Sequence, residues 1–257
     1  VKSDLAKLKK RIEDVGTPLK EWDVSINYGI KTGLNEAFII SGKKRDELIK
    51  EDPKSAEIIK PILRGRDIKR YKAEFADLWL LFVPWHFPLH EEVSISGNST
   101  KAENAFQKQY PAIYNHLKHY KEKLLLRNKS ETGIRYEWYA LQRCAASYYE
   151  EFGKDKILYA EIVYDSAFYF DIKTFYPEAT TFILTGENIK LLTGFLNSKL
   201  LTFAFKMFYA GGDLRGNTFR YKKVCLENLP IPKLRGVNKL PFEILVDCIL
   251  FTKEKNM

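Results

Sequence analysis

Short polar and cationic side chains gather at three places in this sequence. They are Lys31, Thr32 and Asn35 in the first, Arg64, Arg66, Lys69 and Arg70 in the second, and Arg215, Asn217, Arg220 and Lys222 in the third. Lysine and arginine contact phosphates, whereas arginine can donate two hydrogen bonds to guanine, and asparagine can form a pair of hydrogen bonds with adenine. A single cation of this kind is most simply a solvated surface charge. The three clusters together predict contact with DNA.

A fourth candidate lies in the middle of the chain, where Trp138 and Tyr139 precede Gln142 and Arg143. An aromatic pair could wedge beside an unpaired base, as in DNA-deforming proteins. Burial in the core explains Trp138 more simply, because large aromatic side chains usually pack inside. The preceding residues are typical of an exposed loop, from which Arg135 could reach a groove.

Residues for catalysis are sparse. A metal-dependent nuclease needs carboxylates that hold a cation beside a lysine that orients the attacking water. Asp171 and Lys173, with Asp165 as a partner, fit that pattern, and Asp67 with Lys69 repeats the tripeptide. With 29% charged residues such triplets arise by chance, and Asp67 has two simpler roles, orienting an arginine or capping the following turn. The nuclease therefore stays an alternative.

Other catalytic signatures are missing from the sequence. There is no phosphate-binding loop ending in Gly-Lys-Ser/Thr and no serine nucleophile elbow. His86 and His90 have the spacing of helical zinc ligands, but Pro84 and Pro88 disfavour a helix there. The three cysteines are far apart and odd in number, which argues against a disulfide framework. We predict no catalytic residue, no metal and no cofactor in this chain.

The net charge of the chain indicates which class of partner it binds. The 257 residues include 42 Lys and Arg against 33 Asp and Glu, a net charge of +9. Such an excess favours a polyanion, either nucleic acid or an anionic membrane surface. No apolar run approaches the ~20 residues of a membrane-spanning helix, and the N-terminus lacks the apolar core of a signal peptide. We expect a cytoplasmic protein without a membrane partner.

Hydrophobic patterns predict the elements that position these residues. Residues 24–30 alternate apolar and polar side chains, as a half-buried strand does. Residues 31–36 are typical of a hairpin connection to the apolar run 37–40, with Gly33 and Asn35 available for positive φ. Further strands are expected at 78–83, 157–163, 167–172, 180–184 and 219–224, helices at 43–50, 54–60, 111–127, 188–209 and 241–255, and a loop at 86–101. Strands mixed with unevenly spaced helices predict an α+β fold, a single domain with mixed or antiparallel strands and a C-terminal helix.

Several strings in this order resemble a known family. They are YGIKTGLNEAFII at 28–40, KPILRGRDIKRY at 60–71 and LWLLF at 78–82, followed by the motifs at 110–117, 138–139, 156–159, 196–200 and 229–232. The order is similar to that in the target recognition domain of type IIG restriction-modification enzymes, which is related to the C-terminal specificity domain of TaqI-like adenine methyltransferases. The likeness runs from about residue 24 to residue 232.

The resemblance implies a division of labour. This chain would read double-stranded DNA, while methyltransferase and nuclease domains of the same polypeptide, N-terminal to Val1, would use S-adenosylmethionine and magnesium. The glycine-rich turn and the Pro-Pro-aromatic motif of an amino-methyltransferase are absent here. We expect residues 1–23 to be a helical connector from that missing part, 24–232 to form the recognition domain, and 233–257 to carry an amphipathic helix. Cations from both ends of the chain should then share one concave surface.

Three alternatives stay open. The chain could be half of a type I specificity subunit, although the helices predicted at 111–127 and 241–255 are short for the spacers of that class. It could be a compact nuclease that uses Asp165, Asp171 and Lys173. It could also be an interaction module whose basic face binds an acidic protein.

Overall fold

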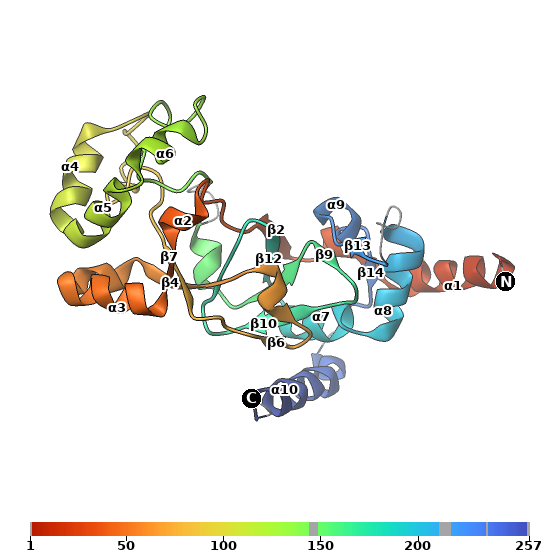
Figure 1. Ribbon diagram of the computed structural model, residues 1–257. Coiled ribbons are helices and arrows are strands. Elements are labelled where there is room, and N and C mark those ends of the chain that lie inside the picture. Colours follow the sequence, from red (N-terminus) through yellow and green to blue (C-terminus); the bar gives the residue numbers. More distant parts are fainter. Residues whose placement is uncertain (1, 144–148, 211–216, 235, 256–257) are drawn as a thin grey trace.

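The computed structural model describes residues 2–143, 149–210, 217–234 and 236–255 as helices around mixed sheets (Figure 1). The α-helices are α1 (Lys2–Val15), α2 (Asn35–Phe38), α3 (Gly42–Glu51), α4 (Thr100–Gln109), α5 (Pro111–Lys118), α6 (Lys121–Leu126), α7 (Ile189–Leu196), α8 (Lys199–Ala204), α9 (Lys223–Leu226) and α10 (Leu240–Lys255). The strands are β1 (Thr17–Pro18), β2 (Val24–Tyr28), β3 (Ile39–Ser41), β4 (Ile59–Leu63), β5 (Ile68–Lys69), β6 (Lys72–Ala73), β7 (Leu78–Leu81), β8 (Lys156–Ala160), β9 (Ile162–Val163), β10 (Phe168–Asp171), β11 (Tyr176–Pro177), β12 (Thr181–Gly186), β13 (Phe219–Arg220) and β14 (Pro230–Ile231). The predicted α+β fold class is confirmed.

An antiparallel sheet in the order β10-β8-β12-β2 separates two hydrophobic cores. Side chains alternate between the faces of a strand. Tyr159 and Phe182 therefore stack on one face, with ring centroids 5.2 Å apart, whereas Leu158 and Ile183 enter the core on the other face. Burial on both faces explains why β8 and β12 carry apolar residues at consecutive positions, 157–160 and 182–184.

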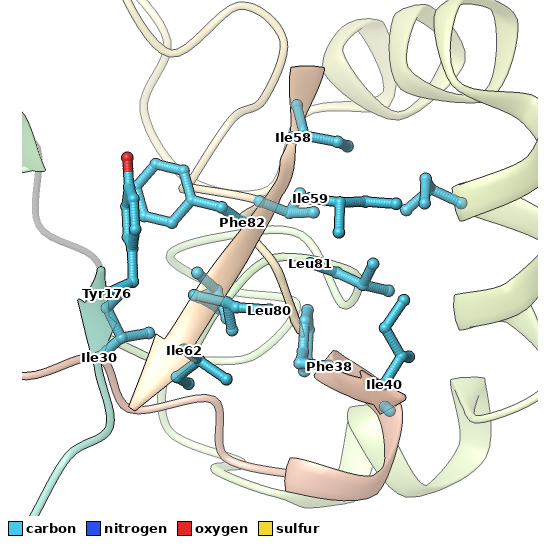
Figure 2. Packing of buried hydrophobic residues seen from close by; sticks show 14 of the residues in the cluster. Ile30, Phe38, Ile40, Ile58, Ile59, Ile62, Leu80, Leu81, Phe82 and Tyr176 are labelled. Carbon is cyan, nitrogen blue, oxygen red and sulfur yellow. The ribbon is translucent and has the colours of Figure 1, made fainter. Parts of the chain in front are cut away.

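A second sheet, β11-β4-β7-β3, lies within the core that Leu158 and Ile183 enter. Figure 2 shows its packing, in which side chains from β3, β4 and β7 interdigitate with Phe38 of α2 and Ile30 of the preceding segment. Helices α4, α5 and α6 contribute Phe106, Ile113 and Leu124 to the same core. These helices gather at the end of the molecule opposite α1 (Figure 1).

The hairpin predicted at residues 31–36 is wrong. Strand β2 pairs with β12, and the apolar run 37–40 is divided between α2 and β3, which belongs to the second sheet. The segment between them crosses from one sheet to the other. Gly33 has the predicted positive φ, at 77°, whereas Asn35 is the first residue of α2. Local pattern cannot distinguish a crossing from a hairpin, because the pairing partner lies some 150 residues away in sequence.

Most other predicted elements are confirmed in type, with shifted bounds. The helix at 43–50 is α3, and the strands at 78–83, 157–163, 167–172 and 180–184 are found. Residues 54–60 instead form a 3-10 turn, η2 (Pro53–Glu57), and the start of β4. The helix at 111–127 is interrupted between α5 and α6, and the one at 188–209 is divided into α7, α8 and a π-helical turn, η5 (Phe205–Tyr209). Only Phe219 and Arg220 of the strand at 219–224 are paired.

The loop predicted at 86–101 is found as turns and irregular structure up to residue 99, and α4 begins at Thr100. A buried carboxylate organises it: Glu137 accepts hydrogen bonds from the backbone nitrogens of His86 and Ser99 and contacts His86 Nδ1 at 3.0 Å. Glu137, which lies outside residues 86–101 in sequence, thus connects this loop to the core.

Part of the segment predicted as a connector, residues 1–23, pairs with the end of the predicted recognition domain. Strand β1 pairs with β14, so residues 17–18 lie beside 230–231 (Figure 1). Helix α10 is found near the predicted bounds and packs on α7, where Val246 lies above Gly194. A β-carbon at Gly194 would come within 2.9 Å of Val246 Cγ2, so glycine allows this close approach.

Candidate nucleic-acid interface

An open hollow of about 540 Å³ brings together two of the predicted clusters. Asn35 comes from the start of α2, and Arg64 and Arg66 come from the segment between β4 and β5. Glu36 of α2, with Glu178 and Thr180 between β11 and β12, completes its polar lining. The sequence predicted the first three residues but did not indicate that they share one surface.

The amide of Asn35 is held between two side chains. Thr32 Oγ1 donates to Asn35 Oδ1 at 2.5 Å, and Asn35 Nδ2 donates to Glu178 Oε1 at 2.7 Å. Thr32 itself is buried, with 2% of its surface exposed, so it supports Asn35 from below rather than presenting a surface hydroxyl. Asn35 is exposed at the surface of the hollow.

Arg64 forms a two-pronged ion pair with Asp67. Its Nε and Nη2 each donate to a different carboxylate oxygen at 2.8 Å, and its backbone nitrogen donates to Asp67 Oδ2 at 2.9 Å. The side-chain hydrogen bond with Asp67 raises the pKa of Arg64. Burial opposes ionisation of Asp67, but the hydrogen bonds from Arg64 outweigh it and hold the pKa of Asp67 below its usual value. One of the two predicted roles of Asp67 is found, because it orients an arginine. Its carboxylate also accepts from the backbone nitrogen of Arg64 at the start of η3 (Gly65–Asp67), the turn that ends at Asp67, rather than capping a turn that follows.

Arg127 anchors the segment beneath the hollow, and sequence reasoning missed it. Its guanidinium donates to the carbonyl of Thr32 at 2.5 Å, to that of Trp138 at 2.8 Å and to that of Ala140. Burial lowers the pKa of Arg127 to about 10, so it is charged at neutral pH. A lone arginine after an apolar helix carries no local signal of this role. Glu178 was missed as well, because a single glutamate between two strands carries no local signal of its partner.

The third cluster lies next to the hollow through backbone contacts. Tyr221 N donates to the carbonyl of Glu161, and Glu161 N donates to the carbonyl of Thr180, which lines the hollow. Arg220 and Lys222 flank Tyr221, whose ring is buried. Lys222 is exposed and Arg220 is partly buried.

One further predicted residue, Arg143, lies beside the first cluster. The backbone nitrogen of Arg143 donates to the carbonyl of Lys31 at 2.9 Å, and both side chains are exposed. The Arg143 guanidinium lies 5.9 Å from the centre of the Tyr28 ring. Asn217, exposed and with a φ of 60°, precedes β13. Arg215 lies outside the described residues.

Three predicted residues are placed elsewhere. Lys69 pairs with Glu74 at 3.7 Å, and the Arg70 guanidinium donates to the carbonyl of Asn197 at the end of α7. Arg135 is exposed and lies 3.8 Å from Glu131 in the loop after α6. Of the residues expected on a common surface, Asn35, Arg64 and Arg66 line the hollow. Lys69, Arg70 and Arg135 lie outside it.

The aromatic candidates belong to the core. Trp138 is 4% exposed, its Nε1 donates to Glu103 at 2.7 Å, and Tyr139 is completely buried. The preferred interpretation of Trp138 as a core residue is confirmed.

Asp171, the carboxylate expected for the alternative nuclease, has a structural role. Asp171 is completely buried and bonds Lys156 Nζ at 2.8 Å and the backbone nitrogens of Lys173 and Phe175. Burial lowers the pKa of Lys156, and the charge of Asp171 opposes that effect. Within the described ranges, no three His, Cys, Asp or Glu side chains are grouped to hold a metal ion.

Comparison with known proteins identifies the family. A model described as the TaqI-like C-terminal specificity domain matches residues 60–231. The chain belongs to this family. The resemblance seen in the sequence motifs is thereby confirmed, and the specificity-domain family accounts for the absence of methyltransferase motifs from the chain.

Individual relatives agree with this assignment. The type II methyltransferase M.MjaIV of Methanocaldococcus jannaschii is 23% identical over 232 residues, which cover 88% of this chain and 70% of that protein. The type IIL restriction-modification enzyme MmeI, solved in complex with DNA, matches 93% of the chain with a TM-score of 0.60 at 17% identity, and the type IIG restriction endonuclease BpuSI matches 94% with a TM-score of 0.50 at 11% identity. The chain spans 29% and 28% of those two enzymes. Among the described residues no helix is long and apolar enough to cross a membrane.

Proposed function

We propose that this specificity domain recognises a sequence in double-stranded DNA through the surface around the hollow. One observation carries the proposal: side chains from separate segments, Asn35, Arg64 and Arg66, converge there with polar groups already oriented by Glu178 and Asp67. Oriented amide and guanidinium groups are those that distinguish base edges. The DNA complex of MmeI, whose fold this chain shares, supports the same reading.

The exposed cations around this surface would supply affinity. Arg66, Lys31 and Lys222 are exposed, and the structure shows no ion pair for them within the described residues. Free cations of this kind neutralise phosphates and release counterions, which gives affinity and register without sequence information. Exposed cations without an ion pair would therefore contact phosphates, whereas groups held in place by neighbouring side chains would contact bases.

The chemistry would lie outside this chain. We propose that the domain presents its site to an adenine-N6 methyltransferase and a linked endonuclease of the same polypeptide, acting in the cytoplasm. The name of M.MjaIV and the family of specificity domains support this arrangement. S-adenosylmethionine and magnesium would be held by those catalytic parts. Extrusion of an adenine costs a few kcal/mol, which sequence-matched contacts help to offset.

Selection from random-sequence duplexes tests the proposal. The chain should enrich one short sequence, and competition with unrelated duplexes should leave that preference intact at moderate salt. Arg66→Ala and Lys222→Ala should weaken binding, uniformly where the contact is to phosphate. Failure to bind any duplex at low salt would favour the interaction-module alternative. Magnesium-dependent cleavage lost in Asp171→Ala would favour the nuclease.

A further inference from the structure

We propose that Asn35 reads the major-groove edge of one adenine in the target sequence. This inference rests on the proposed function and adds to it the identity of a base. Asn35 is exposed at the hollow, and its amide is already oriented by Thr32 and Glu178. A group that is oriented before binding loses less conformational freedom when it binds.

The hydrogen-bond network determines which amide atom is which. A carboxylate without a proton can only accept hydrogen bonds, so the atom of Asn35 that faces Glu178 must be Nδ2. The hydroxyl of Thr32 then donates to Oδ1. Rotation of the amide by 180° would place Oδ1 against the carboxylate, where two acceptors repel each other. The direction of the amide is thus specified by chemistry.

One donor and one acceptor stay available. An amide has two Nδ2 hydrogens and two Oδ1 lone pairs, and the described residues use one of each. In the major groove, adenine presents an acceptor, N7, beside a donor, N6. Guanine presents two acceptors, cytosine a donor alone, and thymine an acceptor beside a methyl group. Only adenine matches a paired donor and acceptor.

The support under Asn35 is rigid. The Thr32 carbonyl accepts from Arg127 at 2.5 Å and from the backbone nitrogen of Gln142 at 3.4 Å. Gly33 has a φ of 77°, and a β-carbon there would come within 2.8 Å of Arg127 Cδ. Only glycine therefore fits at position 33 without displacing Arg127 or Gln142. This support separates Asn35 from Arg66, which is exposed in the same hollow and whose side chain has no hydrogen bond or ion pair among the residues that the structure describes.

The test uses the chain and the sequence obtained by selection. Each adenine of that sequence is replaced in turn by 7-deazaadenine, which keeps N6 and pairing with thymine but lacks N7. The wild type should lose affinity about 10-fold at one position, in the range of a bidentate base contact. Asn35→Ala should bind the unmodified sequence about 10- to 100-fold more weakly and become insensitive to the substitution at that position.

Two further variants separate reading from folding and from charge. Thr32→Val removes the hydroxyl at nearly constant volume, so it should weaken the preference at the same adenine by a smaller factor than Asn35→Ala. Arg66→Ala should weaken all sequences alike and retain sensitivity to 7-deazaadenine. A cooperative thermal transition like that of the wild type would establish that each variant is folded.

The outcomes distinguish the two proposals. A wild-type chain that binds all duplexes equally would overturn the proposed function itself. A sequence-specific wild type, with a folded Asn35→Ala variant that retains every base preference and the same sensitivity to 7-deazaadenine, would overturn the role of Asn35 and leave the proposed function standing.

Discussion

Replacing Arg127 with methionine should destabilise the chain and remove the anchor of the segment that carries Thr32 and Asn35. The guanidinium satisfies the carbonyls of Thr32, Trp138 and Ala140. Methionine retains most of the apolar stem but donates no hydrogen bond. The carbonyl of Thr32 keeps a partner, the backbone nitrogen of Gln142.

The magnitude follows from the carbonyls left unpaired. Trp138 and Ala140 lose the partner that the structure gives them, and an unsatisfied buried polar group costs about 1–3 kcal/mol. Arg127 is partly exposed, so water can reach part of the vacated space. We therefore expect Arg127→Met to reduce the free energy of unfolding by about 2–4 kcal/mol.

Urea denaturation monitored by tryptophan fluorescence measures this loss, and the slope of the transition checks that the unfolded states are comparable. Lys123→Met is the matched control, because Lys123 lies one turn away in sequence, is exposed, and pairs with Glu36 at the surface. That variant should unfold like the wild type. A loss below about 1 kcal/mol for Arg127→Met, or the same loss for both variants, would show that Arg127 is not the anchor inferred here.

Three other outcomes are expected. Lys156→Met leaves Asp171 buried without its counterion and should cost about 3–5 kcal/mol in denaturant unfolding; adding Asp171→Leu should recover part of that loss, and a cost below about 1 kcal/mol would contradict the importance of the pair. Asp67→Asn should lower stability by about 1–3 kcal/mol at pH 7. The pKa of folded Asp67 lies below its usual 3.8, so its stabilising effect is present above that pH and is lost as the pH falls through the folded value. The difference in stability between Asp67→Asn and the wild type should therefore shrink in acid. A difference that stays constant with pH would refute the assignment. In salt titrations of DNA binding, Arg66→Ala or Lys222→Ala should reduce the slope of log affinity against log salt by about 1, and an unchanged slope would exclude a phosphate contact for the residue replaced.

Local patterns were most informative where one face or both faces of an element are buried. The largely apolar runs that became β8 and β12 predicted strands, and Pro111 predicted the start of a helix, because burial and backbone geometry act over a few residues. The same patterns failed for residues 31–40. There the apolar run is shared by α2 and β3, and the pairing that decides its conformation comes from β7.

Candidate residues could be named without knowing their neighbours. Asn35, Arg64 and Arg66 were chosen for their chemistry alone, and the structure gathers them in one hollow. Lys69 and Arg70 met the same chemical criterion in the same segment, yet they point to Glu74 and to the end of α7. Side-chain direction reverses within a few residues of backbone, so a cluster in sequence is not a cluster in space.

The amino-acid sequence by itself determined the fold class, the family and the chemical types available for binding DNA, because these depend on composition, periodicity and motif order. Only the tertiary structure decided which of those side chains act together. Arg127 and Glu178 orient the segment that carries Asn35 from positions about 90 and 140 residues away in sequence. Contacts of that range are properties of the packed chain, since no local pattern encodes which distant side chain will satisfy a buried carbonyl or hold an amide.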